Sequence, residues 1–176
     1  MMYVKSKLVH SLAIILLGAA MILSGFSAFA AEDHKITFMD PMWDGKTIPD
    51  KQQCPSRGAG VNPHTPKLKI TNLPAGTKYL LMVITDENYG RSGDHGIFRL
   101  KVPSGATEVI FPRIYQLKEE LPSGVTVEKG NRWHKGVGHY LAPCSGGRGN
   151  NYYSDIIPYG EGDKKLGGNY IDWGRY

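Results

Sequence analysis

An aspartate and a histidine, Asp86 and His95, are the side chains of this chain best placed to form a polar site. Asp86 directly follows a run of apolar residues, and His95 ends the glycine-containing loop that comes after it. A carboxylate beside an imidazole stabilises the imidazolium, which is a charged hydrogen-bond donor near neutral pH. We therefore expect a polar pocket between two strands. Each residue also has a structural interpretation, Asp86 as a turn former and His95 as the cap of the next strand.

The strands that must hold this pair are indicated by the apolar pattern on either side of the loop. Residues 80–84 are five consecutive apolar residues, too few for a membrane span and rich in β-branched types. They predict a central strand over 79–85, buried on both faces. Residues 97–102 alternate, with Phe98, Leu100 and Val102 on one face, which predicts a second strand.

Glycine and proline interrupt the rest of the chain at short intervals. The 22 glycines and 11 prolines of the sequence exclude long helices and leave room for short strands. Further strands are predicted at 35–38, 67–71, 107–111 and 152–157. The one helical candidate is 113–121, where Ile114, Leu117 and Leu121 fall on one face. The pattern predicts a mostly β fold, an antiparallel β-sandwich with one or two short helices, and a polar surface segment over 160–168.

The first thirty residues have the pattern of a secretory signal peptide. Lys5 and Lys7 precede an apolar run, and small residues lead up to Ala30. We expect cleavage after Ala30, leaving 31–176 as one domain, periplasmic or secreted and not stably inserted in a membrane. An uncleaved anchor is the alternative, although the apolar run is short for a span.

Charge and cysteine content narrow the partners and the compartment. The formal net charge of +5 is spread along the chain without basic runs between aromatics, which argues against nucleic acid. Two cysteines, Cys54 and Cys144, in an exported protein indicate a disulfide, which would close a long loop and add about 4 kcal/mol of stability. Two buried thiols or one reactive thiol are the alternatives. His64, His134 and His139 lack ligand spacing, so we expect no metal and no other cofactor.

A series of short motifs runs in order through residues 38–159. They are DGKTIP at 44–49, Cys54, GVNPHTPKL at 60–68, LPAGTKYLLMVITD at 73–86, GDHGIFRLKVP at 93–103, LPSG at 121–124, HYLAPCSGG at 139–147 and RGNNYYS at 148–154. In order and spacing these motifs resemble the phosphatidylethanolamine-binding protein (PEBP) family, particularly its bacterial branch. The run at 168–176 would then supply a last strand in place of the closing helix of many members.

The resemblance implies a ligand pocket that binds an anionic headgroup such as phosphate. Its pocket positions, and a basic residue close to them, fall on Asp86, His95, Pro143, Asn150, Tyr152 and Arg148. Asn150 stands where the family has a second histidine, and Gly96 where it has a tryptophan. Backbone N–H groups of the glycine-rich loop at 145–149 could add an anion nest. The replacement of the second histidine by Asn150 and of the tryptophan by Gly96 predicts a weaker or altered ligand preference.

Three classes of function follow. The first is a non-enzymatic binding protein for an anionic small molecule or lipid headgroup, which the resemblance extends to inhibition of a protein partner. The second is an envelope protein-interaction module with a vestigial pocket. The third is a hydrolase using Asp86, His95 and Ser145, which is disfavoured because Ser145 lies in Pro-Cys-Ser-Gly-Gly and not in a nucleophile elbow. We expect no catalytic residues.

Overall fold

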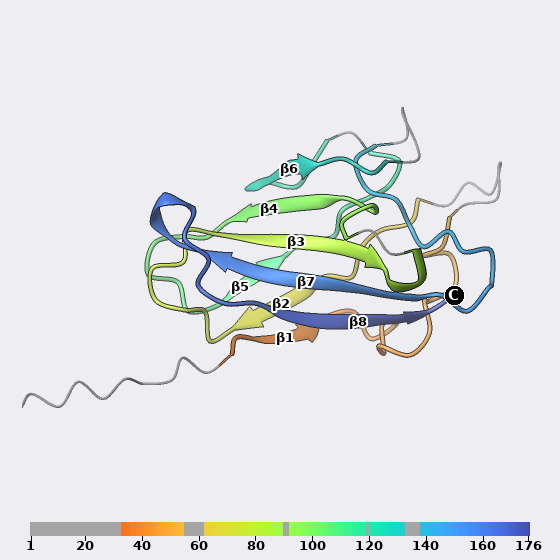
Figure 1. Cartoon of the computed structure of the whole chain (residues 1–176), viewed down its shortest axis with the longest axis horizontal. Coiled ribbons are helices and arrows are strands. Elements are labelled where there is room, and N and C mark those ends of the chain that lie inside the picture. Colours follow the sequence, from red (N-terminus) through yellow and green to blue (C-terminus); the bar gives the residue numbers. More distant parts are fainter. Residues whose placement is uncertain (1–32, 55–61, 90–91, 119, 133–137) are drawn as a thin grey trace, which may run out of the picture. The chain divides into compact units, whose positions relative to one another are not determined.

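Two antiparallel sheets form the fold in the computed structural model, which describes residues 33–54, 62–89, 92–118, 120–132 and 138–176 (Figure 1). The smaller sheet has the order β1-β2-β5 and the larger one β6-β4-β3-β7-β8. Three-residue 3-10 turns η1 and η2 are the described helical elements. The bounds are β1 Lys35–Phe38, β2 Leu68–Thr71, β3 Tyr79–Asp86, η1 Glu87–Tyr89, β4 Ile97–Lys101, β5 Val109–Phe111, β6 Val125–Lys129, β7 Asn151–Tyr159, η2 Glu161–Asp163 and β8 Asn169–Arg175. The predicted β-sandwich is confirmed.

β3 is the central strand of the larger sheet, as the apolar run predicts. It pairs with β4 on one side and with β7 on the other. Seven of its eight residues are buried, Leu81 alone being intermediate. A strand paired along both edges and covered on its inner face is a rigid support. It therefore fixes where its last residue, Asp86, is placed.

The core lies between the two sheets. Alternate residues of β3, β4 and β7 point inward and meet residues of β2 and β5, and all of the following are fully or almost fully buried: Leu80, Met82, Ile84, Phe98, Leu100, Ile156, Leu68, Ile70 and Phe111. Trp173 of β8 packs edge-on against Trp43, with ring centroids 5.5 Å apart, and its Nε1 donates to the Ser154 hydroxyl at 3.0 Å. The buried indole is thus both packed and hydrogen-bonded.

The predicted helix at 113–121 is wrong. This segment is extended in its first half, because its backbone pairs with residues 62–65. Ile114 N donates to the Thr65 hydroxyl at 3.0 Å, and Gln116 N donates to the Pro63 carbonyl at 2.8 Å. Of the three residues on the expected apolar face only Ile114 is buried, whereas Leu117 is half exposed. Tertiary hydrogen bonds outweigh the local helical pattern here.

A disulfide joins Cys54 to Cys144, across 90 positions of sequence and with the two Cα atoms 5.0 Å apart. The prediction of a bridge is confirmed. Next to it, Cys54 N donates to the Pro143 carbonyl at 2.8 Å. The loop that follows β6 is in this way fastened to the segment after β1.

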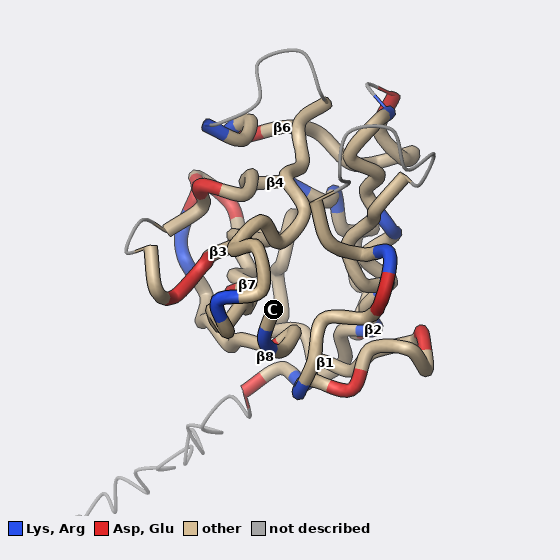
Figure 2. The backbone as a smooth tube through the Cα atoms, turned by 90° about the vertical axis from the view of Figure 1, so that its right-hand side faces the viewer, with Lys and Arg blue, Asp and Glu red and all other residues tan. Residues whose placement is uncertain are grey.

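The segment at 160–168 connects β7 to β8 as a hydrogen-bonded turn. Gly160 N donates to the Lys164 carbonyl at 2.8 Å, and Leu166 N donates to the Pro158 carbonyl at 2.9 Å. Basic and acidic residues are scattered over the described backbone (Figure 2). In the same described part, no helix has the length and apolar character of a membrane span. The expected signal peptide lies outside the described residues.

Candidate functional site

A cavity of about 160 Å³ opens where β3 ends, β4 begins and β7 begins. The loop at 141–150 completes it. Five of the six predicted pocket residues line this cavity: Asp86, His95, Arg148, Asn150 and Tyr152. The other lining residues are Tyr89, Asp94, Leu141, Cys144 and Ser145. The exception is Pro143, which is buried and does not line the cavity; its carbonyl accepts from Cys54 N.

Sheet register explains why residues distant in sequence meet at this point. Asp86 pairs with Tyr152 across β3 and β7, so both residues lie at the same end of the sheet. Tyr152 is on the inward face of β7, in the alternating pattern that also buries Ser154 and Ile156. His95 precedes β4 and is brought beside them because Ile84 N donates to the Gly96 carbonyl at 3.1 Å.

Asp86 is the hydrogen-bonding centre of one wall. The Asn150 amide donates to both of its carboxylate oxygens, at 3.1 and 2.8 Å, and Asn88 N donates to Oδ1 at 3.0 Å. The Asn150 amide, which lines the cavity as predicted, is thus engaged with Asp86. The asparagine thereby fixes the position of the carboxylate.

Tyr152 keeps its proton in this wall. Burial, together with the nearby Asp86 carboxylate, raises the pKa of Tyr152 to about 12. Its hydroxyl accepts a hydrogen bond from Cys144 N at 3.2 Å, and its ring meets the His95 ring edge-on, with centroids 5.3 Å apart. Tyr152 thus links the disulfide loop to the histidine.

His95 is a neutral histidine, which corrects the expected imidazolium. Burial lowers the pKa of His95 below its ordinary value, and the Leu141 carbonyl and the Asp86 and Asp94 carboxylates oppose this only in part. Nδ1 lies 2.8 Å from the Leu141 carbonyl, which can only accept, so Nδ1 carries the proton. No hydrogen bond joins Asp86 to His95 within the described residues. In this neutral tautomer Nε2 is the acceptor nitrogen of the ring.

We predict that acid weakens the fold through this histidine. A histidine whose folded pKa lies below its unfolded value stabilises the protein above pH 6.5, and this contribution is lost as the pH falls toward the folded pKa. For one titrating group, the free energy of unfolding cannot change by more than about 1.4 kcal/mol per pH unit. Urea unfolding between pH 7 and 5 should show a smaller loss in His95→Gln than in the wild type. Equal losses would contradict the neutral assignment. Burial also lowers the pKa of His34 and of His64. The wild type and His95→Gln should therefore both lose some stability as the pH falls.

Asp94 is the lining residue most clearly missed by the sequence-based prediction. It is only 5% exposed, and its Oδ1 lies 3.4 Å from Lys129 Nζ. Its Oδ2 is buried without a hydrogen-bond partner among the described residues. Its place directly before His95, in Gly-Asp-His-Gly, was the available signal.

Ser145 is not arranged as a nucleophile. Its hydroxyl donates a short hydrogen bond to the Tyr176 carbonyl. Among the described residues no hydrogen bond connects it with His95, so a serine-histidine couple is not formed. Over the same residues, no group of three or more His, Cys, Asp or Glu side chains is arranged to hold a metal ion.

Arg148 stands at the exposed edge of the cavity. Within the part of the chain that the structure describes, its guanidinium makes no ion pair or side-chain hydrogen bond. The glycines around it, Gly146, Gly147 and Gly149, all have φ between 67 and 80°. This left-handed backbone favours glycine. Gly149 N donates to the Tyr176 carbonyl at 2.8 Å.

Comparison with known proteins identifies the fold. No family model matches the chain, and no curated protein matches it. Among solved structures, the chain is similar to Escherichia coli YbcL, described as a new member of the mammalian PEBP family. The TM-score is 0.57 at 15% sequence identity, over 81% of this chain and 97% of that one. The chain therefore has the PEBP fold that the motif order predicts, while membership of the bacterial branch stays a prediction.

Proposed function

We propose that this protein is an exported, non-enzymatic binding protein whose cavity takes the oxyanion of a small molecule or a lipid headgroup. The observation that carries the proposal is the Arg148 guanidinium, which has no ion-pair partner among the described residues and lies at the edge of a cavity where Asp86 is already held in place by Asn150. A fixed wall lets a ligand bind without ordering the site first. The PEBP fold of YbcL supports a binding role by analogy.

The polarity of the cavity favours a protonated oxyanion over a fully ionised one. A neutral His95 offers Nε2 as an acceptor, so it suits the hydroxyl of hydrogen phosphate or of a phosphate monoester monoanion. Arg148 and peptide N–H groups of the glycine-rich loop suit the charged oxygens. Sulfate carries no proton near neutral pH, so it can pair with the donors, Arg148 and the peptide N–H groups, but not with the acceptor Nε2.

Export is supported by two independent features. The leader at 1–30 has the charge and apolar pattern of a secretory signal. The Cys54–Cys144 disulfide suits an oxidising compartment. We therefore propose that the protein acts in the periplasm or outside the cell.

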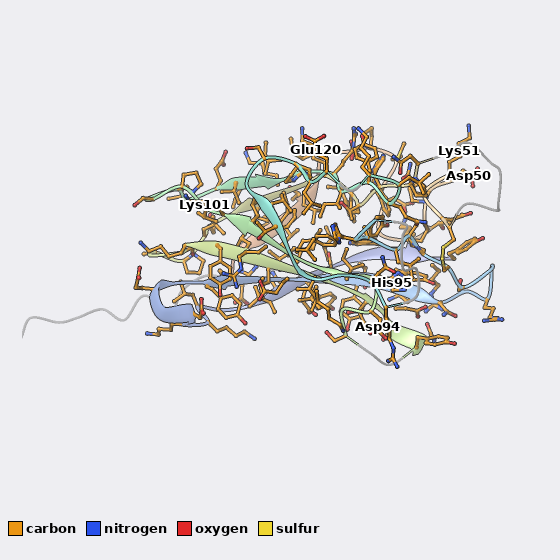
Figure 3. The ribbon with its side chains drawn as sticks, turned by 90° about the horizontal axis from the view of Figure 1, so that it is seen from above. Asp50, Lys51, Asp94, His95, Lys101 and Glu120 are labelled. Atoms are coloured by element: carbon orange, nitrogen blue, oxygen red, sulfur yellow. A yellow bond between two sulfur atoms is a disulfide. The ribbon has the colours of Figure 1, made fainter. Side chains whose placement is uncertain are left out.

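Calorimetric titration of residues 31–176 with phosphate at pH 7.5 tests the proposal. We expect saturable binding, with sulfate weaker than phosphate. Arg148→Gln should weaken phosphate binding by about tenfold or more, because a charge-assisted hydrogen bond is lost. Lys101→Gln is the matched control: Lys101 lies at the other end of the sheet from His95 (Figure 3) and should leave the affinity unchanged.

Two results would count against this function. Absence of phosphate binding by the folded protein would favour a protein-interaction module with a vestigial pocket. Equal weakening by Arg148→Gln and Lys101→Gln would show that a general surface charge, and not this cavity, attracts the anion.

A further inference from the structure

The Cys54–Cys144 disulfide belongs to the cavity wall as well as to the scaffold. Cys144 lines the cavity and is exposed, whereas Cys54 is half-buried. Cys144 N donates to the Tyr152 hydroxyl at 3.2 Å, and the Tyr152 ring packs edge-on against that of His95. One half of the bridge is therefore both part of the cavity and open to solvent.

Arg148 lies in a loop that touches little else. Gly146, Gly147 and Gly149 around it all have positive φ, and an added Cβ at any of them would meet nothing within 4 Å. Glycine leaves the backbone more conformational freedom than any other residue. The position of the Arg148 guanidinium therefore depends on how the two ends of the loop are held.

Both ends of this loop are anchored, and the first is anchored by a covalent bond. At the far end the Asn150 amide donates to Asp86 at 2.8 Å. At the near end the anchors are the disulfide of Cys144 and the hydrogen bond from the Ser145 hydroxyl to the Tyr176 carbonyl. Reduction leaves the near end with hydrogen bonds alone, which are individually weak. The loop can then carry Arg148 away from the cavity.

We propose that phosphate binding at this cavity is controlled by the oxidation state of Cys54 and Cys144, so that the bridged protein binds and the dithiol protein binds weakly. This inference rests on the proposed oxyanion site and concerns its regulation. An exported protein of this kind acquires its affinity only on reaching an oxidising compartment.

Thiol–disulfide exchange with a small-molecule disulfide accounts for the change of state. One cysteine thiolate attacks the reagent disulfide, forms a mixed disulfide and releases one reagent thiol. The second cysteine thiolate then displaces the other reagent thiol and closes the protein bridge. Two electrons pass to the reagent, and one S–S bond replaces another. In the reverse direction Cys144, the exposed member of the pair, is the one that a reducing thiolate reaches more readily.

Calorimetric titration of residues 31–176 with phosphate at pH 7.5 compares the oxidised wild type with Cys54→Ser/Cys144→Ser, which cannot form the bridge. We expect the double variant to bind about tenfold more weakly, because binding must then order the loop. Leu68→Ala is the destabilised control. It removes part of a fully buried side chain in β2, away from the cavity lining, and should keep the wild-type affinity. Near-ultraviolet circular dichroism checks that each protein is folded.

Reciprocal linkage gives a second measurement on the wild type. If the bridged protein binds phosphate about tenfold more tightly, saturating phosphate must make the bridge about tenfold harder to reduce. For a two-electron couple this is a fall of about 30 mV in the reduction potential of the bridge. Dithiothreitol redox buffers, with chloride at the same ionic strength as the reference, measure it. Arg148→Gln should show little or no fall.

The outcomes separate this inference from the function beneath it. If the oxidised wild type does not bind phosphate, the oxyanion site itself is wrong. If it binds, but the double variant binds equally well or Leu68→Ala loses as much affinity, the oxyanion site stands and the redox control is overturned. A reduction potential that phosphate does not change overturns it as well. So does an unfolded double variant, because the bridge then serves the whole fold and not this loop.

Discussion

Removing the Cys54–Cys144 disulfide should lower the free energy of unfolding by about 4 kcal/mol, because the bridge closes a loop across 90 positions and restricts the unfolded chain. For a domain of this size the loss corresponds to a fall in melting temperature of roughly 8–16 °C. Guanidinium unfolding of Cys54→Ser/Cys144→Ser, compared with the oxidised wild type, measures it.

The reduced wild type is the control for this experiment. Reductant should bring the wild type to the stability of the double variant and should leave the variant itself unaffected. A loss below about 1 kcal/mol would show that the bridge contributes little beyond the Cys54 to Pro143 backbone hydrogen bond.

Replacing Gly96 by alanine should cost about 3 kcal/mol or more. Gly96 has φ of 118°, where L side chains are strained, and an added Cβ would lie 2.6 Å from the Phe98 ring and 3.0 Å from the His139 carbonyl. Phe98 is fully buried in the core and has little room to move. The strain would also displace His95, so phosphate binding should weaken together with stability. Urea unfolding and calorimetry of the same variant measure the two effects.

Gly105→Ala separates backbone strain from the collision. Gly105 also has positive φ, at 76°, but nothing lies within 4 Å of its added Cβ. This control should cost only about 1–2 kcal/mol, the penalty of the left-handed region. A cost for Gly96→Ala no greater than that for Gly105→Ala would contradict the packing around His95.

Much of the fold could be predicted because the strands carry strong local signals. The apolar run of β3 and the alternation in β4 are sufficient to identify these strands. β6 was missed although Val125 and Val127 alternate, because five residues between turns give a weak pattern. The segment at 113–121 could not be interpreted correctly, because its pairing with residues 62–65 is a long-range contact that the helical spacing of Ile114, Leu117 and Leu121 does not reveal.

The members of the site could be predicted better than their chemistry. The motif order indicated Asp86, His95, Asn150 and Tyr152, and Arg148 was added as a nearby basic residue; the structure gathers all five around one cavity. The charge of His95 depends on how deeply it is buried, which no local pattern reports. In the same way, the engagement of Asn150 with Asp86 depends on side-chain direction across β3 and β7.

Anomalous diffraction from crystals of residues 31–176 grown with arsenate would locate the oxyanion, because arsenate shares the charge and the proton of phosphate and its arsenic scatters anomalously. We expect an arsenic peak inside the cavity, between Arg148 and His95 Nε2, in the wild type and its loss in Arg148→Gln. A fully occupied peak elsewhere on the surface, with the cavity holding only water, would contradict it.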